Sequence, residues 1–218
     1  MDRVLAGFAR VDGDLVVSEA HGVAYQLGMT STARYDEAYF AKVSAYEDGD
    51  IAQAVNAGRC AMLARHMPAG ARVFDIGAGS GAFVRDALQA GFDAKGFDVM
   101  AGAIERLCAD GLYADDPAEF DAVTLWDVIE HLEYPGAMLE KVPAGAFLFV
   151  SLPVFEDLGR VRESRHYRPG EHLTYWTARG FIDWAAAYGF RLLEQSTHET
   201  DAGRDSIGAF AFRRDKEK

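Results

Sequence analysis

Apolar and polar residues repeat with two different periods along this chain of 218 residues. Short apolar runs predict buried strands, and apolar residues three and four positions apart predict helices. The predicted strands begin at residue 73 and then cover residues 93–98, 122–126, 146–152, 190–199 and 206–212. The predicted helices cover residues 35–46, 50–66, 82–90, 103–109, 136–141 and 178–188. Because strand and helix alternate, we expect an α/β fold around a parallel sheet with right-handed crossovers.

Two segments fall outside this alternation. Residues 4–17 contain the pair Asp12-Gly13, which suits a two-residue hairpin turn. We therefore predict a hairpin extension over residues 1–34, ahead of a single larger domain over residues 35–218. Residues 154–176 show neither period, and a long irregular segment inside a compact domain usually has a function. We predict that this segment is a lid.

A glycine-rich turn follows the first predicted strand. Gly77, Gly79 and Gly81 allow a ligand to approach the backbone closely, because they carry no Cβ atom and accept positive φ angles. The spacing of Gly77, Gly79 and Ala82 also fits the relaxed dinucleotide fingerprint, so a nicotinamide or flavin cofactor is an alternative. Asp75 argues against it, because an acid at this strand end would repel a pyrophosphate. A cationic cofactor without phosphate, such as S-adenosylmethionine, fits better.

A second acid ends the second predicted strand. Asp98 follows Gly81 by 17 residues, near the spacing at which an acid accepts both ribose hydroxyls of a cofactor. NAD and S-adenosylmethionine share a free 2′-hydroxyl, so Asp98 argues against NADP alone. Ligands of open parallel sheets bind at the carboxyl ends of the strands. That edge should carry Asp75, Gly77, Gly79, Asp98, Asp127 and Pro153.

The chain resembles a known family in these segments. Residues 73–100 are similar to motif I and the acidic loop of class I S-adenosylmethionine-dependent methyltransferases. Residues 121–132, which end in Glu130-His131-Leu132, resemble the subgroup that includes ubiquinone-pathway O-methyltransferases. The turn at residues 133–135 departs mildly from that subgroup, which has an Asp-Pro-like turn there. The resemblance covers roughly residues 35–213 and is weak in the first 30 residues.

The resemblance implies a Rossmann-like, doubly wound sheet of seven strands. The sheet would be mostly parallel, with an antiparallel C-terminal strand and helices on both faces. The implied cofactor is S-adenosylmethionine, lying over residues 77–81 with its ribose at Asp98 and its adenine near residues 113–116. The implied cofactor-binding residues are Asp75, Ile76, Gly77, Ala78, Gly79, Gly81, Asp98, Val99, Asp115, Trp126, Asp127 and Val128.

Two histidines are candidates for acid–base chemistry. A hydroxyl or protonated amine must lose a proton when it accepts a methyl group, and imidazole titrates near neutral pH. His131, just beyond the fourth strand, is the first candidate base, although it could instead be a structural histidine bonded to the backbone. His172 is the second, because related enzymes place a histidine before an aromatic pair, here Tyr175 and Trp176.

Two histidines and a glutamate of the lid segment could in principle bind a metal ion. His166, Glu171 and His172 have neither zinc spacing nor a nearby cysteine, so we predict no metal site. The two cysteines, Cys60 and Cys108, fit core thiols within predicted helices.

Composition narrows the class of substrate. The net charge is −12, with 22 Lys and Arg against 34 Asp and Glu, and this would repel a nucleic-acid backbone. Arg160, Arg162, Arg165 and Arg168 form one basic cluster that could override the repulsion. No apolar run approaches 18 residues, so we expect no contact with a membrane and a cytoplasmic location.

We therefore predict a methyltransferase that moves a methyl group to an O, N or C atom of a small molecule, as a monomer or a homodimer. Three alternatives remain: a methyltransferase acting on nucleic acid or protein, an inactive interaction protein with the same fold, and an NAD(P) oxidoreductase.

Overall fold

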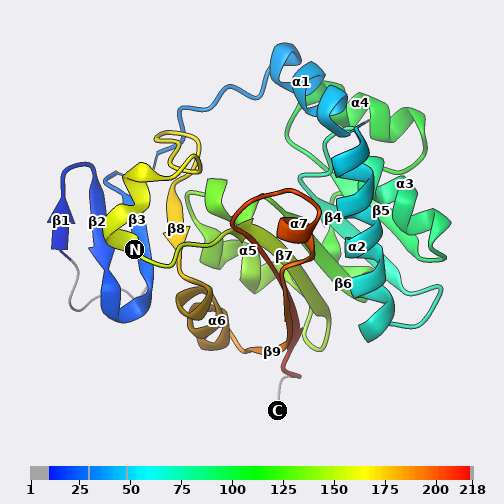
Figure 1. The fold of residues 1–218 in the computed structure, drawn as a ribbon. Helices are drawn as coiled ribbons and strands as arrows, with labels where there is room; N and C mark the ends of the chain where they lie inside the picture. The colour runs from blue at the N-terminus through cyan, green and yellow to red at the C-terminus, as the bar shows by residue number, and fades with distance from the viewer. Residues whose placement is uncertain (1–9, 29, 48, 217–218) are drawn as a thin grey trace.

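The structure is a computed structural model that describes residues 10–28, 30–47 and 49–216. Its main sheet has six strands in the order β5-β4-β6-β7-β10-β9 (Figure 1). The strands are β4 (Arg72–Ile76), β5 (Asp93–Phe97), β6 (Ala122–Trp126), β7 (Phe147–Pro153), β9 (Phe190–Ser196) and β10 (Ile207–Arg214). β10 pairs in antiparallel fashion with both β7 and β9, whereas the pairs among β5, β4, β6 and β7 are parallel. The predicted antiparallel C-terminal strand is therefore confirmed.

The prediction of seven strands is wrong. A seventh strand would lie beyond β5, where Tyr113 forms a single parallel bridge with Gly96. Gly96 donates to the carbonyl of Leu112 and accepts from the amide of Ala114, so the contact is confined to one short segment. Pro117, which has no amide hydrogen to donate and starts a 3-10 helix, follows soon after. The segment is too short for a strand ladder.

The helices, apart from an unpredicted one at residues 198–201, agree with their predicted ranges to within a few residues. They are α1 (Glu37–Glu47), α2 (Asp50–His66), α3 (Ala82–Gln89), α4 (Ala101–Ala109), α5 (Pro135–Lys141), α6 (Ala178–Ala187) and α7 (His198–Asp201). Thr177 caps α6, and its hydroxyl accepts a hydrogen bond from the Gly180 amide. One boundary is wrong: the strand predicted over residues 190–199 ends at Ser196, and Glu199 lies in α7.

Helices cover both faces of the main sheet. Alternate residues of each strand point to opposite faces. On one face, Val73, Ala122 and Phe149 pack with residues of α2, α3 and α4. On the other, Phe74 and Val123 pack with residues of α5 and α6. This doubly wound arrangement matches the prediction, and it leaves the carboxyl ends of β4, β5 and β6 at one edge.

A second, antiparallel sheet stands beside the main one (Figure 1). Its strands are β1 (Arg10–Asp12), β2 (Leu15–Ser18), β3 (Val23–Gln26) and β8 (Thr174–Trp176). The pairing of β1 with β2 confirms the hairpin predicted around residues 11–15, and residues 4–9 of its predicted range lie outside the described residues. The division at residue 34 stays a prediction.

The segment over residues 154–176 is more regular than predicted. It contains a 3-10 helix (Leu158–Glu163) and ends in β8, whose partner is β3 of the N-terminal extension. Leu158 and Val161 pack against Leu15, Val17 and Tyr175. The extension and the predicted lid therefore form one unit, a pairing distant in sequence that local periodicity cannot show.

Candidate cofactor and acceptor site

The glycine turn lies between the end of β4 and the start of α3. Gly77, Gly79 and Gly81 have φ angles of 78°, 55° and 80°, in the left-handed region that favours glycine. The amides of Gly77 and Ala78 both donate to the carbonyl of Phe97 at the end of β5. A Cβ atom on Gly77 would collide with Cγ2 of Val128, which follows β6. The turn is thus held against both neighbouring strands, and Ala78 and Val128, two predicted site residues, lie at these contacts.

Asp75 lies beneath this turn. Its side chain is only 3% exposed, and Oδ1 accepts a hydrogen bond of 2.5 Å from the hydroxyl of Thr124 in β6. Burial raises the pKa of Asp75 to about 7, although the bond from Thr124 and the charge of Arg59 act in the opposite direction. A nearby cation would therefore favour the ionised form of this carboxyl group. Ile76, the next predicted residue, packs in the core on the other face of the sheet.

Two more carboxylates accept hydrogen bonds from backbone amides of the turn. Asp98 accepts hydrogen bonds from the amides of Gly79 (2.8 Å) and Met100 (2.9 Å). Glu47, at the end of α1, accepts one from the amide of Ser80 (3.0 Å). Burial raises the pKa of both carboxyl groups. Each oxygen of Asp98 has a second lone pair, so its bonds to the turn are compatible with the predicted bonds to ribose. Sequence reasoning missed Glu47, since no motif marks it.

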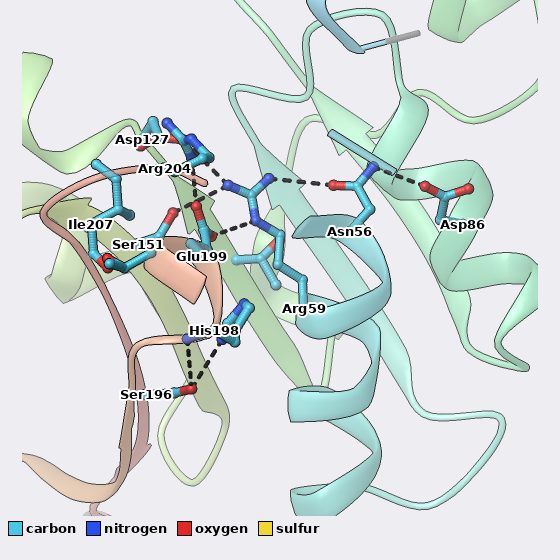
Figure 2. A network of polar contacts seen from close by, with 12 residues as sticks. Asn56, Arg59, Asp86, Asp127, Ser151, Ser196, His198, Glu199, Arg204 and Ile207 are labelled. Atoms are coloured by element: carbon cyan, nitrogen blue, oxygen red, sulfur yellow. Dashed lines mark hydrogen bonds and ion pairs between the residues drawn. The ribbon is translucent and has the colours of Figure 1, made fainter. Parts of the chain in front are cut away.

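Asp127, predicted to bind the cofactor, lies in a network of ion pairs (Figure 2). Its Oδ2 is 2.7 Å from Nη1 of Arg204 and 3.3 Å from Nη2 of Arg59. Arg59 also donates to Glu199 at 2.7 Å and to Ser151 at 3.3 Å, and Arg204 pairs with Glu199 as well. Burial would raise the pKa of Asp127, but the two guanidinium groups hold it below its usual value. The side chain of Asp127 therefore stays charged.

The same network positions Trp126. The guanidinium group of Arg59 lies 4.7 Å from the centroid of the Trp126 ring. The rings of Trp126 and Phe83 pack edge to face, with centroids 5.3 Å apart. Asp127 has a φ angle of 57°, an unusual value for a residue other than glycine. Sequence reasoning missed Arg59, although its place among the buried positions of α2, between Val55 and Met62, was an available signal.

Two further predicted residues are exposed, although the backbone amide of one of them, Val99, hydrogen-bonds to Asp98. Val99 is 69% exposed, and Asp115 is exposed and forms no hydrogen bond or ion pair with the described residues. Asp116, the neighbour of Asp115, accepts a hydrogen bond from the amide of Ala118 and so caps a 3-10 helix. The cofactor role of Val99 and Asp115 stays a prediction.

The two candidate catalytic histidines meet at the end of β6. The rings of His131 and His172 are perpendicular, with centroids 4.7 Å apart. Nδ1 of His131 bonds to the carbonyl oxygen of Glu171 at 2.9 Å, which makes Nδ1 the protonated nitrogen and leaves Nε2 as an acceptor. Burial lowers the pKa of His131, and it lowers that of His172 to about 3. Both rings are therefore neutral near pH 7.

Glu130 completes this cluster, which we call the Glu130–His131–His172 cluster. Glu130 is 2% exposed, and burial together with the charge of Asp127 raises its pKa well above the ordinary value. Buried Oε2 of Glu130 and Nδ1 of His172 have no hydrogen-bond partner. One ligand atom from each of the three residues lies within 4.8 Å of the others. The set of His166, Glu171 and His172, which was considered from the sequence and rejected, does not come together. Within the described residues, the Glu130–His131–His172 cluster is the group that could hold a divalent cation such as Zn²⁺.

These features define the class of protein: a class I S-adenosylmethionine-dependent methyltransferase, with a glycine turn over a buried acid beside a mostly parallel sheet. A family model described as a methyltransferase domain matches residues 49–195, so the chain belongs to that family. This match confirms the resemblance found in the sequence and, with it, S-adenosylmethionine as the cofactor.

Curated relatives support the family at low identity. The ubiquinone biosynthesis O-methyltransferase of Paraburkholderia phytofirmans is 30% identical over 103 residues, which is 38% of this chain and 44% of the relative. The enzyme of the same description from Methylococcus capsulatus is 29% identical over 189 residues, 74% of this chain and 76% of that one. The match thus spans less than half the length of the first of these relatives.

Solved structures show the same fold. A putative methyltransferase in complex with the Haloferax volcanii Trm112 activator has a TM-score of 0.64 at 16% identity, over 84% of this chain and 96% of that one. The Burkholderia thailandensis 1,6-didemethyltoxoflavin-N1-methyltransferase, solved with its substrate and S-adenosylhomocysteine, has a TM-score of 0.58 at 18% identity. That alignment covers 96% of this chain and all of the other.

Among the described residues, no helix has the length and apolarity needed to cross a membrane.

Proposed function

We propose that this protein transfers a methyl group from S-adenosylmethionine to an oxygen, nitrogen or carbon atom of a small molecule. The observation that carries the proposal is the buried Asp75 under a turn of three left-handed glycines. A buried acid with a raised pKa lowers its free energy by binding a cation, and it disfavours a pyrophosphate. S-adenosylmethionine supplies a methyl group on a cationic sulfur together with a cationic ammonium group.

The residues of this chain would contribute mainly by position. In-line displacement needs two aligned reactants in a site that excludes water. It does not require a nucleophile from the protein. Residues 77–81 and Asp98 would hold the donor, with Asp75 near its ammonium end. Nε2 of His131, free to accept, would take a proton from a hydroxyl or amine acceptor, and the carbonyl of Glu171 would keep the imidazole in the required tautomer.

Ion pairing favours a small acceptor over a nucleic acid. Three of the four arginines in the basic cluster of the lid segment have carboxylate partners: Arg160 with Glu163, Arg162 with Asp14, and Arg168 with Glu171. These pairs reduce the positive charge that the cluster could offer a phosphate backbone, in a chain of net charge −12.

Calorimetry with S-adenosylmethionine, S-adenosylhomocysteine and NAD tests the proposal. We expect binding in the micromolar range for the first two and none for NAD. Transfer of labelled methyl groups to a panel of acceptors, with and without Zn²⁺, then separates an enzyme from an inactive protein of the same fold. Retained cofactor binding with lost turnover in His131→Ala would support the base. Failure to bind either sulfur nucleotide would refute the proposal.

The affinity for the cofactor should depend on pH through Asp75. The pKa of about 7 lies above the ordinary value of 3.8, so the folded protein holds this proton more tightly than the unfolded chain does. The contribution of Asp75 to stability therefore falls as pH rises through this range, whereas its attraction for a cation increases. We expect S-adenosylmethionine to bind more tightly at pH 8 than at pH 6 and to release a proton on binding.

Calorimetry in buffers with different ionisation enthalpies measures this proton release. The control is Asp75→Asn, which should bind more weakly at pH 8 and lose the part of the pH dependence that Asp75 causes. An unchanged pH profile in the variant would show that another group is responsible.

A further inference from the structure

A cavity of about 270 Å³ lies between the segment before α1 and the lid segment. Its walls are residues 32–34 and 169–171 together with Tyr39. The amides of Thr32 and Ala33 both donate to the carbonyl of Gly170, at 2.8 and 3.2 Å. Gly170 has a φ angle of 81°, and a Cβ atom there would collide with the hydroxyl of Thr32. Hydrogen bonds and close packing thus join two walls that are distant in sequence.

The cavity adjoins the candidate catalytic histidine. Glu171, on its wall, provides the carbonyl oxygen that bonds to Nδ1 of His131. The hydroxyl of Tyr39 donates to Oε1 of Glu171 at 3.5 Å. The ring of Tyr39 packs edge-on against Tyr35, with centroids 5.2 Å apart. The ring of Tyr39, which lines the cavity and is packed against Tyr35, offers a surface for a planar group.

Tyr35 links this cavity to the donor side. Burial raises the pKa of Tyr35, and the carboxylates of Glu171, Glu130 and Asp98 raise it further. Its phenol is therefore within electrostatic reach of both Asp98, which holds the glycine turn, and the acids beside the histidines. Tyr35 packs against Tyr39 of the cavity wall, so the cavity lies beside a ring that senses the charges of these acids.

The charges of the cavity favour an anion. Glu171 is compensated, because its Oε1 lies 3.2 Å from Nη1 of Arg168. Arg34 is exposed, lines the cavity and forms no ion pair with any residue in the described ranges. An unpaired guanidinium group in a chain with 34 acids against 22 bases is available to an external carboxylate, which it binds through two parallel hydrogen bonds. A doubly charged phosphate would be repelled more strongly by the neighbouring acids.

We propose that this cavity is the acceptor pocket and that Arg34 selects acceptors that carry a carboxylate group on a planar ring. The assignment of the cavity to the methyl acceptor rests on the proposed methyl transfer. The binding of a carboxylate by Arg34 does not depend on it. Arg34 precedes residues 49–195, which the methyltransferase family model matches.

Binding of benzoate, benzamide and phenyl phosphate to the full chain tests the proposal. Each probe is titrated with and without S-adenosylhomocysteine and followed by saturation-transfer NMR. We expect benzoate to bind more tightly than either of the others. Arg34→Gln should weaken benzoate binding about tenfold or more, the typical effect of losing a charge-assisted hydrogen bond, and Arg34→Lys should restore part of it.

Arg165→Gln is the matched control. Arg165 is an exposed arginine of the lid segment that does not line the cavity, so its loss should leave benzoate binding unchanged. Equal binding of benzamide, tighter binding of phenyl phosphate, or an unchanged affinity in Arg34→Gln would overturn the assignment. Calorimetry with S-adenosylhomocysteine on the same samples tests the proposed function separately. If the protein does not bind S-adenosylhomocysteine but still binds benzoate through Arg34, methyl transfer is refuted and the anion site is not.

Discussion

Replacement of Arg59 by glutamine is expected to lower the free energy of unfolding by about 3 kcal/mol, because the buried charge of Glu199 loses one of its two partners. The side chain of Glu199 is fully buried, and Arg59 donates to it at 2.7 Å (Figure 2). Arg204 would keep one contact with Glu199, so the effect should be at the lower end of the range for buried pairs. For a chain of this length the melting temperature should fall by about 6–12 °C.

Arg65 supplies the matched control for this experiment. It lies in the same helix and pairs with Glu194 at 2.6 Å, but its side chain is 48% exposed. Arg65→Gln should cost less than about 1 kcal/mol, because solvent screens an exposed pair. Chemical denaturation of the two variants measures the difference. Equal losses of stability would show that the network around Glu199 contributes no more than a surface pair does.

Gly77→Ala should reduce the affinity for S-adenosylhomocysteine about tenfold or more, because a disturbance of the turn of about 1.4 kcal/mol corresponds to a factor of ten in affinity. The new methyl group would collide with Val128 and displace either the turn or the end of β6. Alanine is also strained at a φ angle of 78°. Calorimetry on protein whose circular dichroism shows it to be folded measures the loss.

Gly70 separates the collision from the backbone strain. Its φ angle is also 78°, and a Cβ atom there would meet nothing within 4 Å. Gly70 precedes β4, so it lies at the edge of the sheet opposite to the glycine turn. Gly70→Ala should therefore carry the cost of the backbone strain alone, destabilise the protein less than Gly77→Ala does, and bind the nucleotide normally. A similar loss of affinity in both variants would mean that strain alone, rather than the contact with Val128, explains the result.

Features that depend on neighbours in sequence were predictable. The apolar run before Gly77 forms β4, and the break after residue 46 separates α1 from α2. The glycine turn and Asp75 also lie where the pattern placed them, because the end of a strand, a left-handed turn and a helix start require only adjacent residues. The prediction of a seventh strand was wrong because the segment around Tyr113 forms a single bridge and is too short for a ladder of hydrogen bonds.

The roles of polar side chains were harder to predict, because their partners come from distant parts of the chain. Asp127 was predicted at the correct edge, but its partners Arg59 and Arg204 lie in α2 and beyond α7. His131 and His172 were each selected by motif, and only the fold shows that their rings touch and that Glu130 lies beside them.

The sequence by itself determined the doubly wound fold, the position of the glycine turn and the family, since these follow from periodicity, local turn chemistry and a short motif. The tertiary structure decided which charges are available for a ligand. Carboxylates pair with Arg59 and Arg168, whereas Arg34 lines a cavity and has no ion pair within residues 10–28, 30–47 and 49–216. The physical reason is that the strength of a charge depends on its burial and its partners, and folding sets both.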